Sequence, residues 1–441
     1  MWQPQHDRSA SLSLDNSGMG GPTARTTPEL SNLALDCAQL LHVNGQSTHE
    51  MVAAAERLSN SLGMRATIIP RWGELQLQAT YGSETSISIR AADPTGVDMD
   101  RVASATRALN EAAAGRLAAP ALRETIKTIA HAPPAPTWLF TLAAAAGAAA
   151  LAVIFGVRHI AAVGLIIVSA AAGAVVRRTV AKYSTNTLVQ PLCAALLAGT
   201  VGALAVRYQL SSSLRLVAVC PCMILVPGPH VLNGMIDLVG ARISLGGSRL
   251  TYACLIVVAI SVGLLLGLSL LHVSLPVDAP GRAVPLWLDV LAAGVAVAAY
   301  SIFFSTPLRM LGWPVGIGMA AHALRWWTLA AGADAATGAF VACLLVGLVL
   351  TPVARRYQMP FAAVGFAAVV SMMPGVFLFR MASGLLQLAH NSNTTLDLLG
   401  ATIADGMTAV TIILAMSFGV IVPKIFIDSL GDRAAGGLKR D

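Results

Sequence analysis

Residues 214–240 are apolar for long enough to cross a bilayer, but Pro227, Gly228 and Pro229 interrupt them near the middle. Prolines remove backbone donors, and carbonyl groups left free in hydrocarbon need another partner. The break therefore requires a helix bundle or a water-filled cavity around it. Three polar residues follow on one face of the helix that restarts: His230, Asn233 and Asp237. A polar face just past a helix start at membrane depth predicts a substrate site.

The composition predicts the class of protein around this segment. Of the 441 residues, 56% are hydrophobic and 12% are charged, which indicates a polytopic α-helical membrane protein with a soluble part. The net charge of +7 does not indicate nucleic-acid binding, because the basic residues stand singly or in pairs between apolar segments, as in loops that face anionic lipid. The six cysteines form no CxxC pair, and no metal site is predicted.

The polar first third is expected to form a cytoplasmic domain. Residues 1–28 are rich in Ser, Gly, Thr and Pro without an apolar run, which predicts a disordered tail and no signal peptide. Residues 29–131 show helical spacing, then alternation over three short stretches, then helical spacing again, which predicts a small α/β domain. Residues 132–137 form a Pro-rich linker. The domain contains no glycine-rich phosphate loop and no zinc-protease helix, so its sequence assigns it no chemistry.

Ten apolar segments follow the linker, several of them close to the length that a membrane helix needs. They lie near residues 138–155, 159–176, 188–206, 214–239, 250–272, 285–304, 312–329, 336–353, 361–388 and 401–423. Basic residues are more frequent in alternate connections. The positive-inside rule therefore places both termini, including a tail of residues 424–441, in the cytoplasm.

The membrane part contains an internal repeat. The run ALLAGTVGALAVRYQL, which ends at Leu210, aligns with CLLVGLVLTPVARRYQM, which ends at Met359, and the first break recurs at Pro374 and Gly375. Two halves of five segments must have opposite orientations, so we expect inverted repeats with broken helices. Matching breaks of this kind indicate a transporter whose central site opens to either side in turn. The two repeats are predicted at residues 138–272 and 285–423.

The run VPGPHVLNGMIDLVGARISLGGSRLTYA, together with SMMPGVFLFRMASGLLQLA, resembles the threonine/serine exporter family, and the likeness covers almost all of residues 30–425. The resemblance implies an inner-membrane secondary exporter of small hydroxy amino acids with a cytoplasmic N-terminal domain. It implies a transporter and not an enzyme, with the proton gradient as energy source and no cofactor. Split relatives look like exporters of dicarboxylates such as succinate, and the fused halves favour the amino-acid branch without deciding the substrate.

A zwitterionic amino acid needs partners for a carboxylate and for an ammonium group. The helix starts after the two breaks offer backbone donors and a positive dipole end to a carboxylate. Arg380, which aligns with Asn233 of the first half, adds a bidentate partner. An intramembrane charge costs at least about 2.5–3.5 kcal/mol, so we expect Asp237 to bind the ammonium group or a transported proton. The predicted substrate-binding residues are Pro227, Gly228, His230, Asn233, Asp237, Pro374, Gly375, Arg380, Asn186 and Gln190.

Each assignment has a structural alternative. Asp237 and Arg380 could pair with each other, or with Arg242, as locks that only stabilise the fold. His230 could cap its helix instead of carrying a proton. Asn186 and Gln190 could mark a membrane interface instead of lining the pathway. The predicted proton carriers are Asp237, His230 and Asp405, with His322 as a secondary candidate.

Three rival functions stay open at this point. The chain could export dicarboxylates, act as a channel, or be a membrane sensor or enzyme that works through its N-terminal domain. The expected partners are a small acid such as threonine or serine, protons and the lipid bilayer, and not nucleic acid. The sequence leaves the oligomeric state open, a homo-oligomer included.

Overall fold

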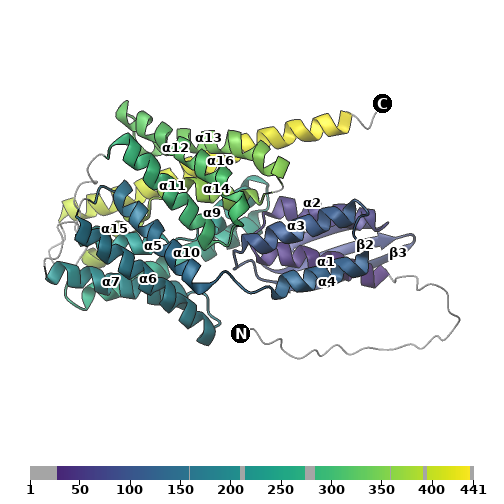
Figure 1. The fold of residues 1–441 in the computed structure, drawn as a ribbon, viewed down its shortest axis with the longest axis horizontal. Coiled ribbons are helices and arrows are strands. Elements are labelled where there is room, and N and C mark those ends of the chain that lie inside the picture. The colour runs from purple at the N-terminus through teal and green to yellow at the C-terminus, as the bar shows by residue number, and fades with distance from the viewer. Residues whose placement is uncertain are drawn as a thin grey trace.

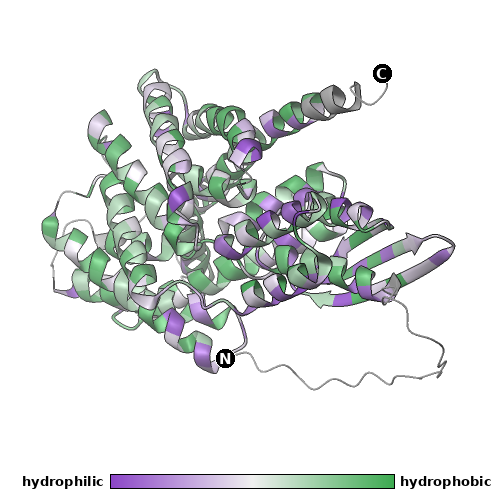
Figure 2. Cartoon of the chain, turned by 45° about the vertical axis from the view of Figure 1, so that its right-hand side comes forward, coloured by the Kyte–Doolittle hydropathy of each residue, from purple (hydrophilic) through white to green (hydrophobic). Residues whose placement is uncertain are grey.

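The computed structural model describes residues 27–157, 159–208, 214–273, 284–357, 359–390 and 395–437. Almost all of the predicted N-terminal tail lies outside these ranges, as does Leu210 of the repeat. Figure 1 shows two parts, a bundle of long helices and a smaller α/β domain that packs against one end of it. The bundle is mostly hydrophobic, whereas the domain carries many hydrophilic residues (Figure 2). The protein is therefore a polytopic helical membrane protein with a small N-terminal α/β part.

The N-terminal domain consists of one antiparallel sheet covered by helices. Strand β2 is central and pairs with both β1 and β3, and Leu75 and Leu77 of β2 are buried under α1, which contacts the same strand. The predicted pattern of two helices, three strands and two helices is confirmed. The elements are α1 (Thr27–Val43), α2 (Thr48–Ser61), β1 (Arg65–Arg71), β2 (Gly73–Tyr81), β3 (Glu84–Ala92), α3 (Met99–Ala113) and α4 (Ala119–His131).

All ten predicted membrane segments contain helix. Within the described residues, seven helices are long and apolar enough to cross a membrane, and two bent helix pairs raise that number to nine. The remaining segment is α12 (Gly312–Ala330). The seven are α5 (Thr137–Ile154), α6 (Ile160–Tyr183), α7 (Val189–Arg207), α10 (Ile243–Ser269), α11 (Leu286–Phe303), α13 (Ala335–Tyr357) and α16 (Leu396–Gly437). Helix α16 continues well past residue 423, where we expected the tail to begin, and a short 3-10 turn, η1 (Leu308–Met310), precedes α12.

Both predicted breaks are confirmed. Helices α8 (Leu214–Met223) and α9 (Gly228–Val239) meet at 55°, and α14 (Phe361–Val369) with the 3-10 turn η2 (Val370–Met372) meets α15 (Gly375–His390) at 58°. Each break abuts the other span, since α9 contacts α14 and α8 contacts α15. We call the place where the two broken spans meet the helix crossing. A Cβ on Gly228 would lie 1.6 Å from the Phe366 ring, and a Cβ on Gly375 would lie 3.0 Å from Met223. The approach at the first break therefore requires glycine.

The helices of the two halves pack in a matching way. In the first half the third helix, α7, packs along the last, α10, and in the second half α13 packs along α16. Glycines allow these contacts, because a Cβ on Gly199 or Gly263 would lie 2.3 Å from a carbonyl oxygen of the facing helix. Small residues let membrane helices approach closely. This packing accords with the repeat, and the inverted orientation of the halves stays a prediction.

Candidate functional site

A cavity of about 370 Å³ lies beside the first break, between the bundle and the N-terminal domain. Its volume falls in the range of roughly 300–1,000 Å³ that is usual for small-molecule sites. Its walls come from α6, the start of α7, the segment between α8 and α9, α10, the end of α11 and the loop before α3. We call this space the break cavity.

Two arginines near the end of α6 line the break cavity. The guanidinium carbon of Arg177 lies 5.0 Å from the centre of the Phe303 ring, and that of Arg178 lies 4.4 Å from the centre of the Phe140 ring. Arg178 also donates to the carbonyl oxygen of Ala135 at 3.0 Å. Stacking on aromatic faces fixes guanidinium groups, which are well shaped to bind carboxylates. This wall can therefore receive an acidic group.

The N-terminal domain contributes a carboxylate to the same cavity. Asp98 precedes α3 and accepts a hydrogen bond from the backbone nitrogen of Arg101 at 3.2 Å. Its carboxylate also forms an ion pair with Nε of the Arg101 side chain at 3.6 Å. Burial raises the pKa of the Asp98 carboxyl above its usual value, while Arg101 acts in the opposite direction. The next residue anchors the domain, since the backbone nitrogen of Met99 donates to the carbonyl oxygen of Phe304 at 3.0 Å. Opposite charges therefore line one small cavity.

Neutral polar groups complete the lining. Tyr252 of α10 donates its hydroxyl to Thr187 at 2.9 Å, and its ring meets His230 edge-on at 5.2 Å between centroids. The ring of Trp72 in the N-terminal domain also contacts the Tyr252 ring, with 5.3 Å between centroids. Gln190, in the first turn of α7, also lines the cavity. Hydroxyl, amide and imidazole groups therefore surround the space between the charges.

The structure places the predicted site residues in several locations. Pro227, His230 and Gln190 line the break cavity. Asn186 is exposed, and its side-chain oxygen accepts a hydrogen bond from the backbone of Leu188 at the start of α7, at 2.9 Å. The others lie elsewhere: Gly228, Pro374 and Gly375 belong to the two breaks, Asp237, Arg380 and Asp405 form ion pairs, and Asn233 donates a hydrogen bond to the N-terminal domain. Their predicted roles in binding substrate or protons stay predictions.

The polar face after the first break points into the N-terminal domain. Asp237 is fully buried, accepts a hydrogen bond from Thr48 at 2.9 Å and pairs with Arg249 at 3.2 Å. Arg242, the partner considered from the sequence, lies farther away at 3.8 Å. Asn233 donates to the carbonyl oxygen of Gly45 at 3.0 Å. These contacts join α9 and α10 to the domain, and we call the group of Thr48, Asn233, Asp237 and Arg249 the domain clamp.

Arg249 was not predicted as a partner of Asp237. We expected the membrane segment to begin at residue 250, which would put Arg249 in a connection, but α10 begins at Ile243. Arg249 is therefore inside a helix and wholly buried. Its charge also reaches His42 of the N-terminal domain, whose pKa falls from 6.5 to about 3, first because of burial and second because of Arg249.

Arg380 has a different partner from Asp237, the residue considered from the sequence. Its Nε lies 3.0 Å from a carboxylate oxygen of Asp405, which joins α15 to α16. Asp237 and Arg380 therefore do not form a pair with each other in this structure. Arg380 was predicted to bind the substrate carboxylate and Asp405 to carry a proton, but in the structure the two residues form an ion pair with each other.

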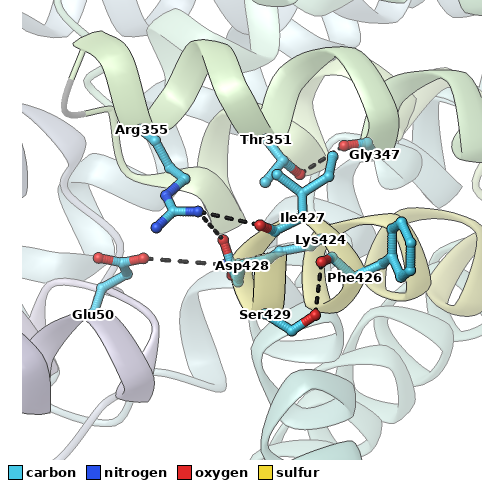
Figure 3. Close-up of polar contacts among 9 residues, drawn as sticks. All are labelled: Glu50, Gly347, Thr351, Arg355, Lys424, Phe426, Ile427, Asp428 and Ser429. Carbon is cyan, nitrogen blue, oxygen red and sulfur yellow. Dashed lines mark hydrogen bonds and ion pairs between the residues drawn. The ribbon is translucent and has the colours of Figure 1, made fainter. Parts of the chain in front are cut away.

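A second cavity, of about 490 Å³, lies between α2 and α3 of the domain and the ends of α13 and α16. Lys424 is buried there, 2.5 Å from Asp428 and 3.9 Å from Glu50 of the domain, and its ammonium group stands 5.0 Å from the centre of the Phe361 ring. Arg355 pairs with Asp428 at 3.5 Å (Figure 3). This network is a further link between the domain and the bundle. No group of His, Cys, Asp or Glu suited to a metal ion occurs in the described parts of the chain.

Comparisons with known proteins cover nearly the whole chain. Residues 32–271 match the family described as "Putative threonine/serine exporter", and residues 289–426 match "Threonine/Serine exporter, ThrE". A protein of Mycobacterium tuberculosis named "Probable threonine/serine exporter" is 24% identical over 407 residues, which are 86% of this chain and 76% of that protein. No solved structure gives a significant match.

Proposed function

This chain belongs to the threonine/serine exporter family, and we propose that it exports threonine, serine or a related small amino acid from the cytoplasm. Export would be secondary active transport across the inner membrane, coupled to protons. The observation that carries this proposal is the break cavity, which has Arg177 and Arg178 on the bundle side and Asp98 on the domain side. A zwitterion carries the complementary pair of charges.

The lining supports one orientation of the substrate. The carboxylate would bind the two stacked guanidinium groups of α6, and the ammonium group would bind Asp98. Charge-assisted hydrogen bonds of this kind are the stronger ones in proteins. A side-chain hydroxyl would then meet Thr187 or Tyr252, which already share a hydrogen bond of 2.9 Å. This arrangement would favour small hydroxy amino acids.

The helix crossing supports transport by alternating access. The break cavity adjoins the first break, and the second break lies directly against the first through the contact of Gly375 with Met223. Bending at the breaks can therefore open one side of the crossing while the other side stays closed. On the domain side the wall is the loop of residues 95–98, so we propose that this loop has to move before substrate enters.

The two ends of the described chain lie on one side of the bundle, which accords with the prediction that both termini are cytoplasmic. The end of α16 lies on the same side of the bundle as the domain (Figure 1), and Lys424 of α16 lies 3.9 Å from Glu50 of the domain. If the domain is cytoplasmic, as the basic connections predict, the break cavity lies near the cytoplasmic end. Substrate would then be captured from the cytoplasm, which is the direction that an exporter needs.

Counterflow of labelled threonine in proteoliposomes tests the proposal, with and without an imposed pH gradient. Asp98→Asn should raise the half-saturating threonine concentration by at least about tenfold, because a charged hydrogen bond contributes roughly 1.5–3 kcal/mol. Asparagine still caps α3, so folding should be kept. The matched control is Asp100→Asn, an exposed residue in the same turn. Equal behaviour of the two variants would refute the orientation given to the substrate.

The break cavity also fits a second substrate class, because two neighbouring arginines suit a dicarboxylate. Unlabelled succinate added in the same assay separates the two. If threonine enters and succinate does not compete, the amino-acid assignment holds. Uptake of succinate alone would move the protein to dicarboxylate export, and no uptake of either by folded protein would favour a sensor that works through the N-terminal domain.

A further inference from the structure

A buried row of three polar side chains lies in the second half of the bundle, away from the break cavity. His322 of α12 places Nδ1 2.9 Å from a carboxylate oxygen of Asp289 on α11, and its Nε2 lies 2.6 Å from the hydroxyl of Ser371 in η2. All three are buried, with exposed fractions of 5% for Asp289, 0% for His322 and 3% for Ser371. We call these three residues the histidine relay.

The hydrogen bonds within the histidine relay depend on whether His322 carries one proton or two. Beside an ionised Asp289, which only accepts, Nδ1 of His322 donates to the carboxylate in either state. In the neutral state Nε2 accepts from the Ser371 hydroxyl and can take up one proton. Ionisable residues within membrane helices are costly and usually mark a functional site. The three side chains come from three different elements, α11, α12 and η2.

The charges around the histidine relay are few. On α12 itself, Arg325 lies one turn beyond His322, and it interacts electrostatically with Asp289 and with Cys343 of α13. The sequence of α14 carries no titratable residue, and on α11 the other titratable residue is Tyr300, whose hydroxyl donates to the carbonyl of Met223 at 2.8 Å. With neutral His322, the charges of Asp289 and Arg325 balance. A proton on His322 therefore gives the group one net positive charge.

The histidine relay and the break cavity stand toward opposite ends of the bundle. Asp289 lies in the first turn of α11, whereas Phe304, just past the other end of that helix, binds the N-terminal domain through Met99. Fifteen residues separate Asp289 from Phe304, which is roughly 22 Å along a helix. A proton that comes from the side away from the domain would meet the relay before it met the break cavity.

The histidine relay is also connected to the helix crossing. Ser371 precedes the second break by three residues, and Gly375 at that break packs against Met223 of α8. The carbonyl of Met223 accepts the hydrogen bond from Tyr300, and the segment that follows Met223 lines the break cavity. A change at Ser371 can therefore reach the wall of the substrate site through one packed contact between the breaks.

We propose that Asp289, His322 and Ser371 bind the proton that is coupled to export, an inference that rests on the proposed function. The proton adds to Nε2 of His322, and the Ser371 hydroxyl turns from donor to acceptor. The imidazolium that forms stays paired with Asp289 through Nδ1. The reversed hydrogen bond at Ser371 favours one of two angles between the helices on either side of the second break. Release of the proton restores the other angle. No bond other than N–H forms or breaks, and the proton is supplied by the gradient.

Two transport assays on the same reconstituted protein test this assignment. Threonine exchange at equal pH needs the substrate site alone, whereas accumulation driven by a pH gradient needs the proton site as well. His322→Gln and Ser371→Ala should exchange threonine and fail to accumulate it. The control is Ser301→Ala, because Ser301 is also a fully buried serine of the bundle and its hydroxyl has no hydrogen-bond partner among the described residues. It should behave as wild type in both assays.

A direct measurement of protons removes any dependence on transport rates. Threonine added to purified protein in weakly buffered detergent solution, with a pH indicator, should release protons from wild type and from Ser301→Ala but not from His322→Gln. If wild type shows no threonine exchange, the proposed function fails. If it exchanges threonine while His322→Gln still accumulates it and still releases protons, the proposed function stands and the histidine relay is not the proton site.

Discussion

The domain clamp gives a sharp prediction of coupling between two buried charges. Asp237→Asn keeps an acceptor for Thr48 and removes the charge that lies 3.2 Å from the wholly buried guanidinium of Arg249. Leaving a buried charge without its partner costs about 3–5 kcal/mol. At roughly 2 °C per kcal/mol for a large chain, the apparent Tm should fall by about 6–10 °C. The double variant with Arg249→Met removes both charges at similar volume and should regain most of that loss.

Tryptophan fluorescence during heating of the purified protein in detergent measures the four Tm values of this cycle. The control is Arg242→Met, because Arg242 lies 3.8 Å from Asp237 and a third of its side chain is exposed. Such a pair contributes at most about 1 kcal/mol. If the double variant loses as much as the two single variants together, the charges are independent and the clamp does not couple them.

Three further predictions concern single contacts. The pKa of His42 is about 3 in the folded protein, below the unfolded value of about 6.5. The unfolded protein therefore binds this proton more readily, so the free energy of unfolding is highest above pH 6.5 and falls as the pH is lowered. At pH 5 the loss is about 2 kcal/mol, and His42→Leu should remove this pH dependence from unfolding curves. Gly228→Ala should abolish the yield of folded protein in size-exclusion profiles, because a Cβ would overlap the ring of Phe366, and adding Phe366→Leu should restore part of it. Glu50→Gln should lower the free energy of unfolding by less than about 1 kcal/mol, since Glu50 is partly exposed and 3.9 Å from Lys424; a larger loss in chemical denaturation would contradict that estimate.

The sequence predicted those features of the fold that are written in local patterns. Runs of apolar residues located the membrane segments, and Pro227 with Gly228 located the first break, because prolines and glycines act on their own backbone. The second break was found from the repeat, which needs only an alignment of the chain with itself. The order of helices and strands in the N-terminal domain followed from periodicity in the same way.

The contacts that build the sites could not be predicted, because they join residues far apart in the chain. Thr48 meets Asp237 across 189 positions, and no local pattern pairs them. Asp289 and Ser371 are single polar residues within apolar stretches, so each looks like an ordinary helix residue until His322 is placed between them. Arg177 was assigned to a connection by its charge, whereas α6 continues to Tyr183 and brings it to the break cavity.

The contact of Gly228 with Phe366 also constrains how the protein is made. Phe366 is synthesised 138 residues after Gly228, which takes about 7–28 s at roughly 5–20 residues per second. During that time Gly228 and its helix have already been synthesised, but the Phe366 ring that packs against Gly228 has not. The first half must therefore wait in the membrane in an unfinished state. The break cavity, whose lining includes Phe303 and Phe304, is likewise completed only when the second half is inserted.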